Sequence, residues 1–426
     1  MTANAGLRPH RAAVVIGAGP SGASAAILLA RSGWSVTLIE QHAFPRQKVC
    51  GECVAAGNIA ILEELGVAQA FRRLAGAELT RVGWMRGDAA VIADMPPCSE
   101  GAARYGRALG RDVFDVMLLE RARAVGVRIL QPAKVRAVSG TAGRFECEIE
   151  YLGEPRAAEG PARRDIVRGS IVIDAHGSWE TGPRFDNPDQ SVCRLPHRPE
   201  DLFAFKASFT DSRLPPGLLP VVSVNGGYGG LVVANDRRTT VALCLRRDTL
   251  RALRSHGGHA SAGAAVENYL RSSCRGIEHA LQDTAPEAPW LTVGPLRPGV
   301  RLREQPGIFA VGNAAGETHP LIGEGITMAL QSSRLLADAL LMHVARSVSA
   351  ASLSATHRSY ASAWRKAFLP RLRLAAVYAQ VAMHAPLAGT ATAGLRAWPA
   401  LLTSAARMAG KARRAVDPLI MHEETP

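Results

Sequence analysis

Two cysteines in C-x-x-C spacing, Cys50 and Cys53, stand in the segment KVCGEC together with Lys48 and Glu52. Such a pair can exchange electrons as a dithiol, supply half of a zinc site, or belong to a loop that lies against a bound molecule. A four-ligand zinc site needs a second C-x-x-C or an H-x-x-x-H partner, and the sequence has neither. The other cysteines are isolated, which is typical of a reducing compartment and argues against a disulfide framework. We therefore expect no metal site, and the dithiol and the loop remain open.

A second group of chemically informative residues is a glycine-rich turn inside a predicted strand–helix–strand unit. Residues 12–16 and 35–39 are short apolar runs typical of buried strands, and residues 24–31 favour a helix. The turn is a G-x-G-x-x-G, whose glycines allow a tight turn, the close approach of a pyrophosphate and the packing of helix on strand. The helix N-terminus presents N–H groups to the anion, and a carboxylate after the second strand accepts from a ribose 2′-hydroxyl. The predicted dinucleotide-binding residues are Gly17, Gly19, Pro20, Ser21, Gly22 and Glu40.

The rest of the chain supplies the elements that must position these residues. Short strands are predicted at residues 81–88 and 90–96, an alternating, half-buried strand at 144–153, and a buried strand running into a turn at 170–177. Residues 111–124 predict an amphipathic helix. Between residues 180 and 290, strand-like runs separated by Gly and Pro predict an antiparallel sheet. The expected fold class is α/β, with a Rossmann-like nucleotide-binding domain, an antiparallel β-sheet substrate domain and a helical C-terminal tail. The expected limits are 1–80, 101–180 and 296–345 for the first domain, 81–100 and 181–295 for the second, and 346–426 for the basic tail.

Three separated segments resemble one flavoprotein superfamily. They are GAGPSG with Glu40, IDAHGS at 173–178 and AVGNAAGETHPLIGEGI at 310–326. Together they resemble the aromatic hydroxylases (para-hydroxybenzoate hydroxylase-like monooxygenases), geranylgeranyl reductases and flavin-dependent halogenases, with the reductase-like branch nearest. The resemblance covers the chain to about residue 340 and implies FAD as cofactor. The further FAD-binding residues that it implies are Arg46, Lys48, Cys50, Gly51, Arg111, Asp174, Gly177, Gly312, Asn313, Pro320, Gly323 and Gly325.

The resemblance also gives expectations for single residues. The superfamily usually has Asp where this chain has Asn313, which loses a charge but can still accept from a ribityl hydroxyl. A Cys-Gly segment like Cys50–Gly51 lies against the isoalloxazine ring in the reductase-like branch, and Arg46 or Lys48 would meet the pyrophosphate. Cys53 is outside that pattern, so a dithiol and plain packing stay as alternatives to a flavin-contacting loop. No catalytic base is evident, and the weak catalytic candidates are Glu52 and His319.

The resemblance leaves the reaction open among three chemistries. Halogenases of this superfamily usually carry W-x-W-x-I-P, which is absent, and the reductases usually carry Y-x-W-x-F-P, for which residues 227–232 offer GYGGLV without the tryptophan. We therefore expect an NAD(P)H-dependent monooxygenase acting on an aromatic or lipophilic phenol- or quinol-type substrate. The alternative is a geranylgeranyl reductase-like enzyme that saturates alkenes of an isoprenoid or lipid. A halogenase and a non-catalytic FAD-binding protein rank below both.

The formal net charge of +13 and the pI of about 10 bear on partners. The charge is mostly dispersed Arg, aromatic residues make up only 5%, and no RNA-binding signature is present, so we expect no nucleic-acid partner. No run of about 20 apolar residues occurs, which favours a cytoplasmic protein. In the tail, apolar residues such as Trp364 and Phe368 alternate with cations such as Arg371 and Arg373. These helices either cap the substrate domain or rest peripherally on an anionic membrane, and Pro370 is expected to interrupt the first of them.

Overall fold

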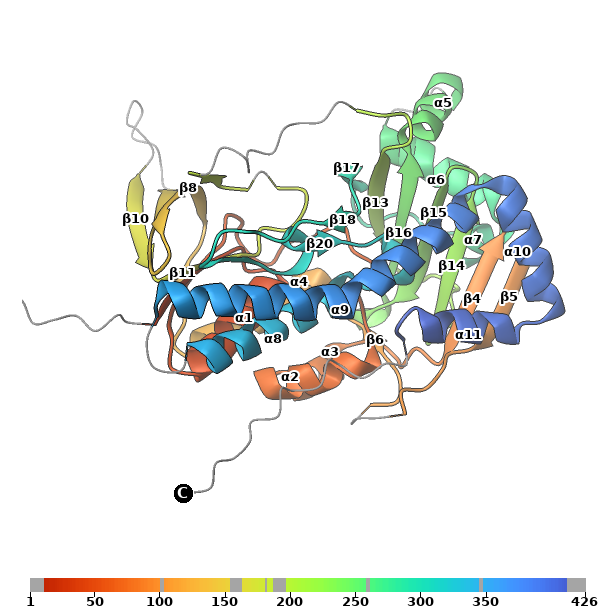
Figure 1. The fold of residues 1–426 in the computed structure, drawn as a ribbon. Helices are drawn as coiled ribbons and strands as arrows, with labels where there is room; N and C mark the ends of the chain where they lie inside the picture. The colour runs from red at the N-terminus through yellow and green to blue at the C-terminus, as the bar shows by residue number, and fades with distance from the viewer. Residues whose placement is uncertain are drawn as a thin grey trace, which may run out of the picture.

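A parallel five-stranded sheet forms the centre of the first domain in this computed structural model, which describes residues 11–99, 103–153, 163–180, 182–186, 197–257, 261–344 and 348–411 (Figure 1). Its strand order is β19-β11-β1-β2-β7, and every neighbouring pair is parallel. Three segments that are far apart in the sequence therefore meet at one sheet. The strands are β1 (Ala12–Ile16), β2 (Ser35–Ile39), β7 (Arg128–Leu130), β11 (Ile171–Asp174) and β19 (Ile308–Ala310).

Both faces of this sheet are buried, because successive side chains of a strand point to opposite sides. Val15 and Ile173 pack with three helices on one face, whereas Val14 and Val172 pack against a second, four-stranded sheet on the other. The short apolar runs seen in the sequence are explained by this two-sided burial. The elements involved are α1 (Pro20–Arg31), α4 (Arg111–Ala124), α8 (Gly325–His343), β8 (Ala133–Thr141), β9 (Arg144–Tyr151), β10 (Arg164–Gly169) and β12 (Arg184–Phe185).

A seven-stranded sheet forms the second domain, in the order β17-β13-β16-β15-β14-β4-β5. All neighbouring pairs are antiparallel except β14 and β4, which are parallel. One face packs on α6 and α7, with Phe205 and Leu243 in the core between them. The bounds are β4 (Arg81–Arg86), β5 (Ala89–Asp94), β13 (Leu202–Phe209), β14 (Leu218–Val224), β15 (Gly227–Val233), β16 (Thr239–Arg246), β17 (Leu291–Leu296), α5 (Arg247–Gly257), α6 (Ala262–Ser273) and α7 (Arg275–Ala280).

Short elements connect the two domains and build their facing edges. The 3-10 turns η4 and η5 and the start of α8 follow β19 and carry the GNAAGETHPLIGEG segment. Together with the two sheets and their helices, they confirm the predicted α/β class. The remaining elements are β3 (Cys53–Val54), β6 (Arg107–Ala108), β18 (Gly299–Val300), β20 (Gly316–Glu317), α2 (Ile59–Leu65), α3 (Ala68–Leu74), η1 (Ala56–Asn58), η3 (Asn235–Arg237), η4 (Gly312–Ala314) and η5 (Pro320–Ile322).

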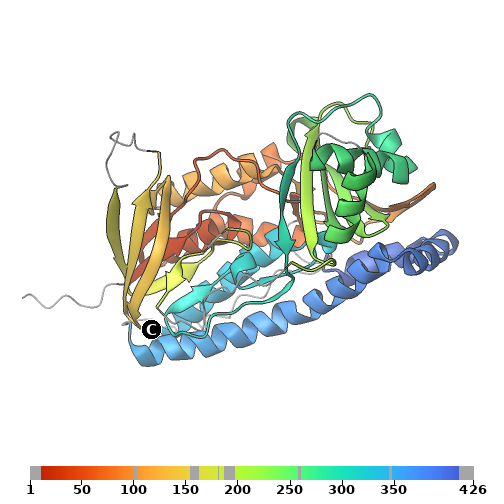
Figure 2. The same cartoon turned by 90° about the horizontal axis from the view of Figure 1, so that it is seen from above.

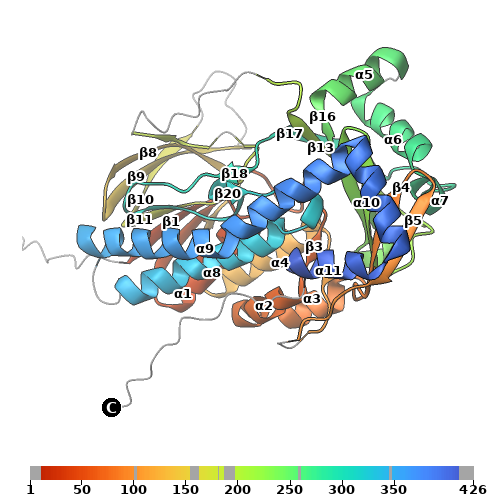
Figure 3. The same cartoon turned by 45° about the vertical axis from the view of Figure 1, so that its right-hand side comes forward.

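Three C-terminal helices join the domains: α9 (Ala350–Met383), α10 (Ala385–Ala397) and α11 (Ala400–Met408). Figures 2 and 3 show α9 running along the first domain and crossing to the seven-stranded sheet, where α10 and α11 follow. Within the described ranges, no helix is long and apolar enough to cross a bilayer. The part of the predicted tail beyond residue 411 lies outside the described residues.

The expectation that Pro370 interrupts the first tail helix is wrong, because α9 continues through it. Proline in a helix interior removes one hydrogen bond and costs about 3 kcal/mol. Here the residues around it are held by the core, since Phe368 and Leu372 are buried against the first domain. Helix α1 also departs from expectation: it begins at Pro20, four residues before Ser24, because proline is well suited to the first turn of a helix.

Trp364 tests how firmly α9 belongs to the first domain. It is fully buried, its ring lies 5.2 Å from that of Phe368, and it packs against Gly316. We expect Trp364→Ala to lower the free energy of unfolding by about 3 to 5 kcal/mol, through lost burial and the cavity left behind. Urea unfolding of the apoprotein measures this, with the exposed Trp398→Ala as the matched control. Equal, small effects of both substitutions would contradict the structural role of α9.

Candidate functional site

A cavity of about 200 Å³ opens at the carboxyl ends of the parallel strands. The turn after β1, the end of β2 and the segment after β11 all line it, together with the loop before α8. Ligands in open parallel sheets bind at this edge. The predicted residues that line it are Gly17, Gly19, Pro20, Ser21, Glu40, Arg46, Lys48, Cys50, Gly51, Glu52, Arg111, Gly177, Asn313, Pro320, Gly323 and Gly325.

The three glycines of the glycine-rich turn have different surroundings. Gly17 has a φ of +99°, and a side chain there would lie 2.6 Å from the Ala175 carbonyl oxygen. At Gly22, a side chain would collide with the Gly17 carbonyl, so this glycine permits close packing of α1. At Gly19, a side chain would meet only the Arg111 guanidinium, at 3.5 Å. The space beside Gly19 is therefore open for a ligand, as a pyrophosphate site requires.

The N-terminus of α1 is available to an anion. Its N-cap, Gly19, supplies no side-chain hydrogen bond, and the first turn contains no acidic residue. The Glu40 carboxylate beside it is buried and fixed, since it accepts from the backbone N–H groups of Ala18 at 2.8 Å and His42 at 2.9 Å. Each Glu40 oxygen retains an acceptor lone pair, as recognition of a ribose hydroxyl needs.

Three cations converge on the same cavity. Arg111 forms a bidentate pair with Asp115 at 2.7 Å, and Arg46 lies 3.6 Å from Glu40. The Arg46 Nε is buried without a hydrogen-bond partner. Burial, and then the charges of Arg46 and Arg111, lower the pKa of Lys48 to about 8. These cations repel one another, so an anionic group such as a pyrophosphate between them would relieve an unfavourable electrostatic arrangement.

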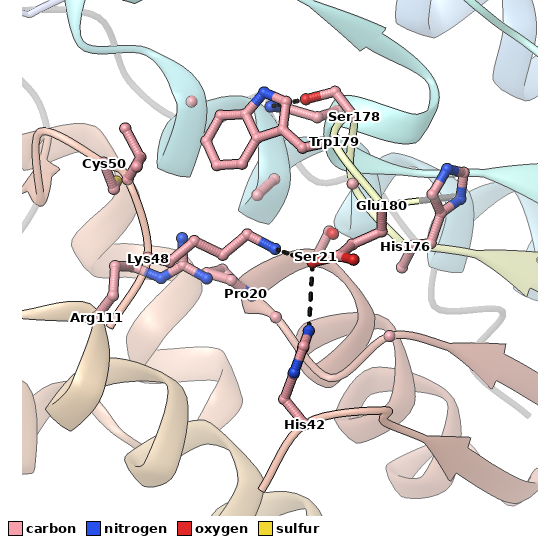
Figure 4. Close-up of a pocket in the computed structure, with 18 of the residues that line it drawn as sticks. Pro20, Ser21, His42, Lys48, Cys50, Arg111, His176, Ser178, Trp179 and Glu180 are labelled. Atoms are coloured by element: carbon pink, nitrogen blue, oxygen red, sulfur yellow. Dashed lines mark hydrogen bonds and ion pairs between the residues drawn. The ribbon is translucent and has the colours of Figure 1, made fainter. Parts of the chain in front are cut away.

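Glu180 and His42 close one side of this cavity, and sequence analysis missed both of them. Figure 4 shows the Lys48 amine and the His42 ring both approaching the Glu180 carboxylate, at 3.8 and 3.3 Å. The Lys48 amine also lies over the Trp179 ring, 5.6 Å from its centre. The sequence held a signal for these residues, since His42 lies two positions after Glu40 and Trp179–Glu180 directly follow IDAHGS.

A second helix N-terminus faces the cavity from the opposite side. Helix α8 begins after Glu324, which gives it no side-chain cap, and Gly323 and Gly325 line the cavity there. A side chain at Gly325 would meet no atom within 4 Å. The Asn313 amide donates to the Ser178 hydroxyl at 3.3 Å, which holds this loop against the segment after β11. A helix N-terminus in this place would stabilise negative charge on a reduced flavin.

Four predicted residues do not line the cavity: Gly22, Asp174, Gly312 and the weak catalytic candidate His319. Gly312 has a φ of +60°, and a side chain there would strike Ser21, so it allows α1 and η4 to pack. Asp174 is fully buried between His176 and Arg303, with the Arg303 contact at 2.6 Å. Burial alone would raise the pKa of Asp174, but the charges of His176 and Arg303 hold it well below its usual range. Asp174 therefore supports the wall of the cavity from behind.

The KVCGEC loop lies where the first cavity meets a second one. Cys50 lines both cavities, and a side chain at Gly51 would meet no atom within 4 Å. Cys53 is buried, and burial raises the pKa of its thiol to about 12, which keeps it protonated at neutral pH. Both cysteines are free thiols. An unreactive Cys53 and open space at Gly51 favour a loop that contacts the flavin over a dithiol.

Glu52, a weak catalytic candidate in the sequence, forms a buried connection between the domains. Its φ is +59°, and both its side chain and that of Lys206 are essentially inaccessible. The carboxylate accepts from the Lys206 amine, from the Thr240 hydroxyl and, at 3.0 Å, from the Arg111 backbone N–H. Lys206 and Thr240 belong to β13 and β16 of the seven-stranded sheet. With its acceptors engaged, Glu52 fixes the loop and the start of α4 against the second domain.

The second cavity, of about 250 Å³, lies between the seven-stranded sheet and α9–α11. Its lining is almost entirely apolar and includes Trp84, Leu231 and Leu402. The exceptions include Tyr228, whose hydroxyl lies 3.0 Å from His319 Nδ1. Burial lowers the pKa of His319 to about 4, so its imidazole is neutral at pH 7 and a weak base. The residues shared with the first cavity are Val49, Cys50, Gly51, Cys53, Trp179, Pro320 and Gly323.

Comparison with known proteins identifies the first cavity. Residues 11–154 match the FAD binding domain family. The chain is 26% identical to digeranylgeranylglycerophospholipid reductase 1 of Methanopyrus kandleri over 83% of its own length and 86% of that protein. It is also 26% identical to conditioned medium factor receptor 1 of Dictyostelium discoideum, over 76% of its length, but spans only 62% of that relative. Residues 11–154 are thus an FAD-binding domain, and the relatives of the whole chain include a reductase. FAD is therefore the cofactor that this domain would bind, and the open turn at Gly19, the convergent cations and the two helix N-termini fit it.

Several solved structures share the fold of this chain. The flavin-dependent halogenase CmlS superposes with a TM-score of 0.69 at 22% identity, covering 86% of this chain and 63% of CmlS. A geranylgeranyl bacteriochlorophyll reductase-like protein of Thermoplasma acidophilum gives a TM-score of 0.63 at 18% identity, over 96% of this chain and 93% of that protein. PqsL of P. aeruginosa, in complex with 2-aminobenzoylacetate, gives 0.60 at 17% identity, over 94% and 99%. The architecture is thus common to enzymes of different chemistry.

A side chain added to the glycine-rich turn is expected to prevent FAD binding. Gly19 has ordinary backbone angles, so Gly19→Val should fold, but its side chain would occupy the space that the pyrophosphate needs. We expect the purified variant to carry no FAD, measured as the ratio of flavin to protein absorbance. Gly389→Val on α10, where space is equally open, is the control and should keep its flavin. A Gly19→Val protein with full flavin content would refute the assignment of this turn.

Substitutions of Glu52 and Lys206 are expected to have non-additive effects on the free energy of unfolding. Lys206→Met leaves a buried carboxylate without its cation, and we expect the free energy of unfolding to fall by about 3 to 5 kcal/mol. The double variant Glu52→Gln/Lys206→Met should recover much of that loss, because no charge is then left unpaired. The exposed pair at Arg213 is the control, where Arg213→Met should change stability by less than about 1 kcal/mol. Urea unfolding of the apoproteins measures all three, and additive effects at Glu52 and Lys206 would count against the pair.

Proposed function

We propose that this oxidoreductase is an NAD(P)H-dependent monooxygenase that hydroxylates an aromatic substrate with an apolar body. The observation that supports this proposal best is the second cavity, whose apolar lining adjoins the FAD cavity at Cys50–Gly51 and Pro320–Gly323. An apolar pocket with few polar groups binds a lipophilic molecule and orients it through those groups. FAD, when bound, would supply the redox chemistry, with reducing equivalents from NAD(P)H and an oxygen atom from O₂.

The chain's own residues would bind the substrate and exclude water. Burial raises the pKa of Tyr228 well above its ordinary value, so its hydroxyl is a neutral hydrogen-bonding group inside the apolar cavity. Its hydrogen bond to the neutral His319 fixes the orientation of that hydroxyl. A phenolic hydroxyl of the substrate would pair with Tyr228, which would place the aromatic ring near the join between the cavities. His319 acts in this proposal as a positioning residue.

A second candidate function is reduction of alkenes in a lipid. It is favoured by the likeness to a digeranylgeranylglycerophospholipid reductase along most of both chains. The same apolar cavity would suit an isoprenoid chain. The two functions differ in what they consume: hydroxylation takes up O₂ and incorporates one of its atoms, whereas alkene reduction adds hydrogen and needs no O₂.

Substrate-stimulated NAD(P)H oxidation with simultaneous O₂ measurement tests the proposal. The FAD-loaded protein is presented with a panel of alkyl phenols, quinols and polyprenyl lipids, and products are analysed by mass spectrometry. We expect O₂ uptake and a gain of one oxygen atom with a phenolic substrate. A product with two added hydrogens and no O₂ uptake would replace the monooxygenase by the alkene reductase.

The variant Tyr228→Phe tests whether the Tyr228 hydroxyl binds the substrate. Loss of one hydrogen bond to the substrate should raise KM about five- to tenfold with a smaller change in kcat, and flavin content should not change. Tyr269→Phe is the control, because its hydroxyl bonds the Asn225 carbonyl on the opposite face of the sheet. Steady-state kinetics with the phenolic substrate measure both. Equal KM values for Tyr228→Phe and the parent enzyme would remove Tyr228 from the substrate site.

A further inference from the structure

The outer surface of α10 and α11 exposes large apolar side chains. Leu387, Trp398, Leu401 and Met408, here called the tail apolar face, are 52%, 68%, 50% and 53% exposed. At the turn between the helices, the whole segment 397–401, AWPAL, is exposed. Figures 1 and 3 show these two helices at the outside of the second domain. Single exposed apolar residues need no explanation, but several on one helical hairpin indicate a binding surface.

The charged residues of α10 and α11 themselves are all basic. Between Asp338 and Asp417 the sequence contains no Asp or Glu. Arg396 and Arg407 are exposed on α10 and α11, beside the apolar residues. Apolar side chains flanked by cations, with an exposed Trp among them, have the chemistry of a helix that lies in the interface of an anionic membrane.

Helix α9 does not provide such a surface, although its sequence suggested one. Trp364, Phe368 and Leu372 are buried against the first domain, and α9 serves there as a capping helix. Among the large apolar residues of α9, Val377 is exposed, at 58%. The membrane surface expected from the tail is therefore displaced along the chain to α10 and α11.

The inner side of the same helices forms a wall of the second cavity. Ala391 and Leu395 of α10 and Leu402 and Ala406 of α11 line it. Leu401 and Leu402 are neighbours in the chain, yet one is exposed and the other lines the cavity. A single layer of helix, with small alanine side chains in it, thus separates the apolar cavity from the tail apolar face.

We propose that the tail apolar face docks on the surface of an anionic lipid bilayer and that the lipophilic substrate passes from the bilayer to the second cavity between α10 and α11. The docking half stands on the exposed apolar and cationic residues alone. The passage half rests on the proposed function, because it assumes that the substrate occupies the second cavity.

Charge argues for a bilayer and against a second copy of this chain. Two copies meeting through this face would bring Arg396 and Arg407 of both chains together without any acidic residue of α9–α11 to pair with them. Like charges facing each other in an interface are unfavourable, whereas each cation near anionic lipid is favourable. The helices are also firmly seated, since Thr403 donates to the Asp94 carbonyl at 2.7 Å and Trp84 donates to Thr392 at 2.9 Å. Substitutions on the outer face should leave the fold intact.

Vesicle sedimentation of the FAD-loaded, full-length protein tests the docking. Vesicles of phosphatidylcholine alone are compared with vesicles that also contain phosphatidylglycerol, at low salt. We expect binding to the anionic vesicles only. The variant Trp398→Ser/Leu401→Ser should bind about tenfold or more weakly, because two large apolar side chains no longer reach the interface. Arg396→Gln/Arg407→Gln should bind more weakly too, and its remaining binding should depend less on salt.

Matched controls lie on other parts of the molecule. Ile166→Ser removes an apolar residue that is 47% exposed on β10, and Arg251→Gln/Arg254→Gln removes two exposed cations from α5. Both should bind vesicles as the parent does. The docking proposal is overturned if the parent binds neither vesicle, if the controls lose as much binding as the test variants, or if the parent is a dimer that Trp398→Ser/Leu401→Ser dissociates. These readouts need no turnover, so they are independent of the proposed reaction.

The passage half has its own measurement. Turnover of a substrate embedded in anionic vesicles is compared with turnover of a short-chain, water-soluble analogue. In Trp398→Ser/Leu401→Ser we expect the first rate to fall about tenfold and the second to stay at the parent value. Equal loss of both rates in the variant would overturn the passage. If the parent protein turns over neither substrate, the proposed function is rejected and the docking result still stands.

Discussion

The buried pair between Glu52 and Lys206 is the contact on which the arrangement of both cavities depends. A carboxylate and an ammonium removed from water are tolerated only when each is paired and hydrogen-bonded, and here the Arg111 backbone and Thr240 complete the shell. The pair ties the KVCGEC loop and the start of α4 to the seven-stranded sheet. It thereby fixes where Gly51, at the join of the two cavities, stands relative to the sheet that carries Tyr228.

The two cavities differ in the charge of the side chains that line them. The FAD cavity brings Arg46, Lys48 and Arg111 together with two helix N-termini, groups that suit a diphosphate. The second cavity is nearly free of charge and keeps Tyr228 and His319 neutral through burial. A charged cofactor would therefore favour the first cavity and an apolar substrate the second, before any specific contact is made. One scaffold can serve several flavin chemistries in this way.

Helices α9 to α11 connect stability, substrate binding and the proposed membrane surface. The first part of α9 buries Trp364 and Phe368 against the FAD domain, and its end reaches the second cavity at Tyr378. Helices α10 and α11 then present one side to the cavity and the other to the exterior. A change in α10 or α11 can thus alter access to the cavity without touching the FAD-binding turn, because α9 holds the tail to the first domain independently.

The resemblance of three separated segments to a flavoprotein superfamily implied FAD as the cofactor. The sequence by itself determined the local parts: the strand–turn–helix around Gly17–Gly22, helix 111–124 and most strands of the two larger sheets. Such features depend on residues close together in the chain, where backbone geometry and apolar periodicity decide the outcome. Only the tertiary structure decided that Asp174 lies behind the cavity wall, that Glu52 is engaged by Lys206, and that α9 continues through Pro370. The Asp174–Arg303 and Glu52–Lys206 contacts join residues 129 and 154 positions apart, and long-range burial and ion pairing outweigh local propensity there. The same reason explains why Trp364 is buried whereas Trp398 is exposed, a difference that no local pattern shows.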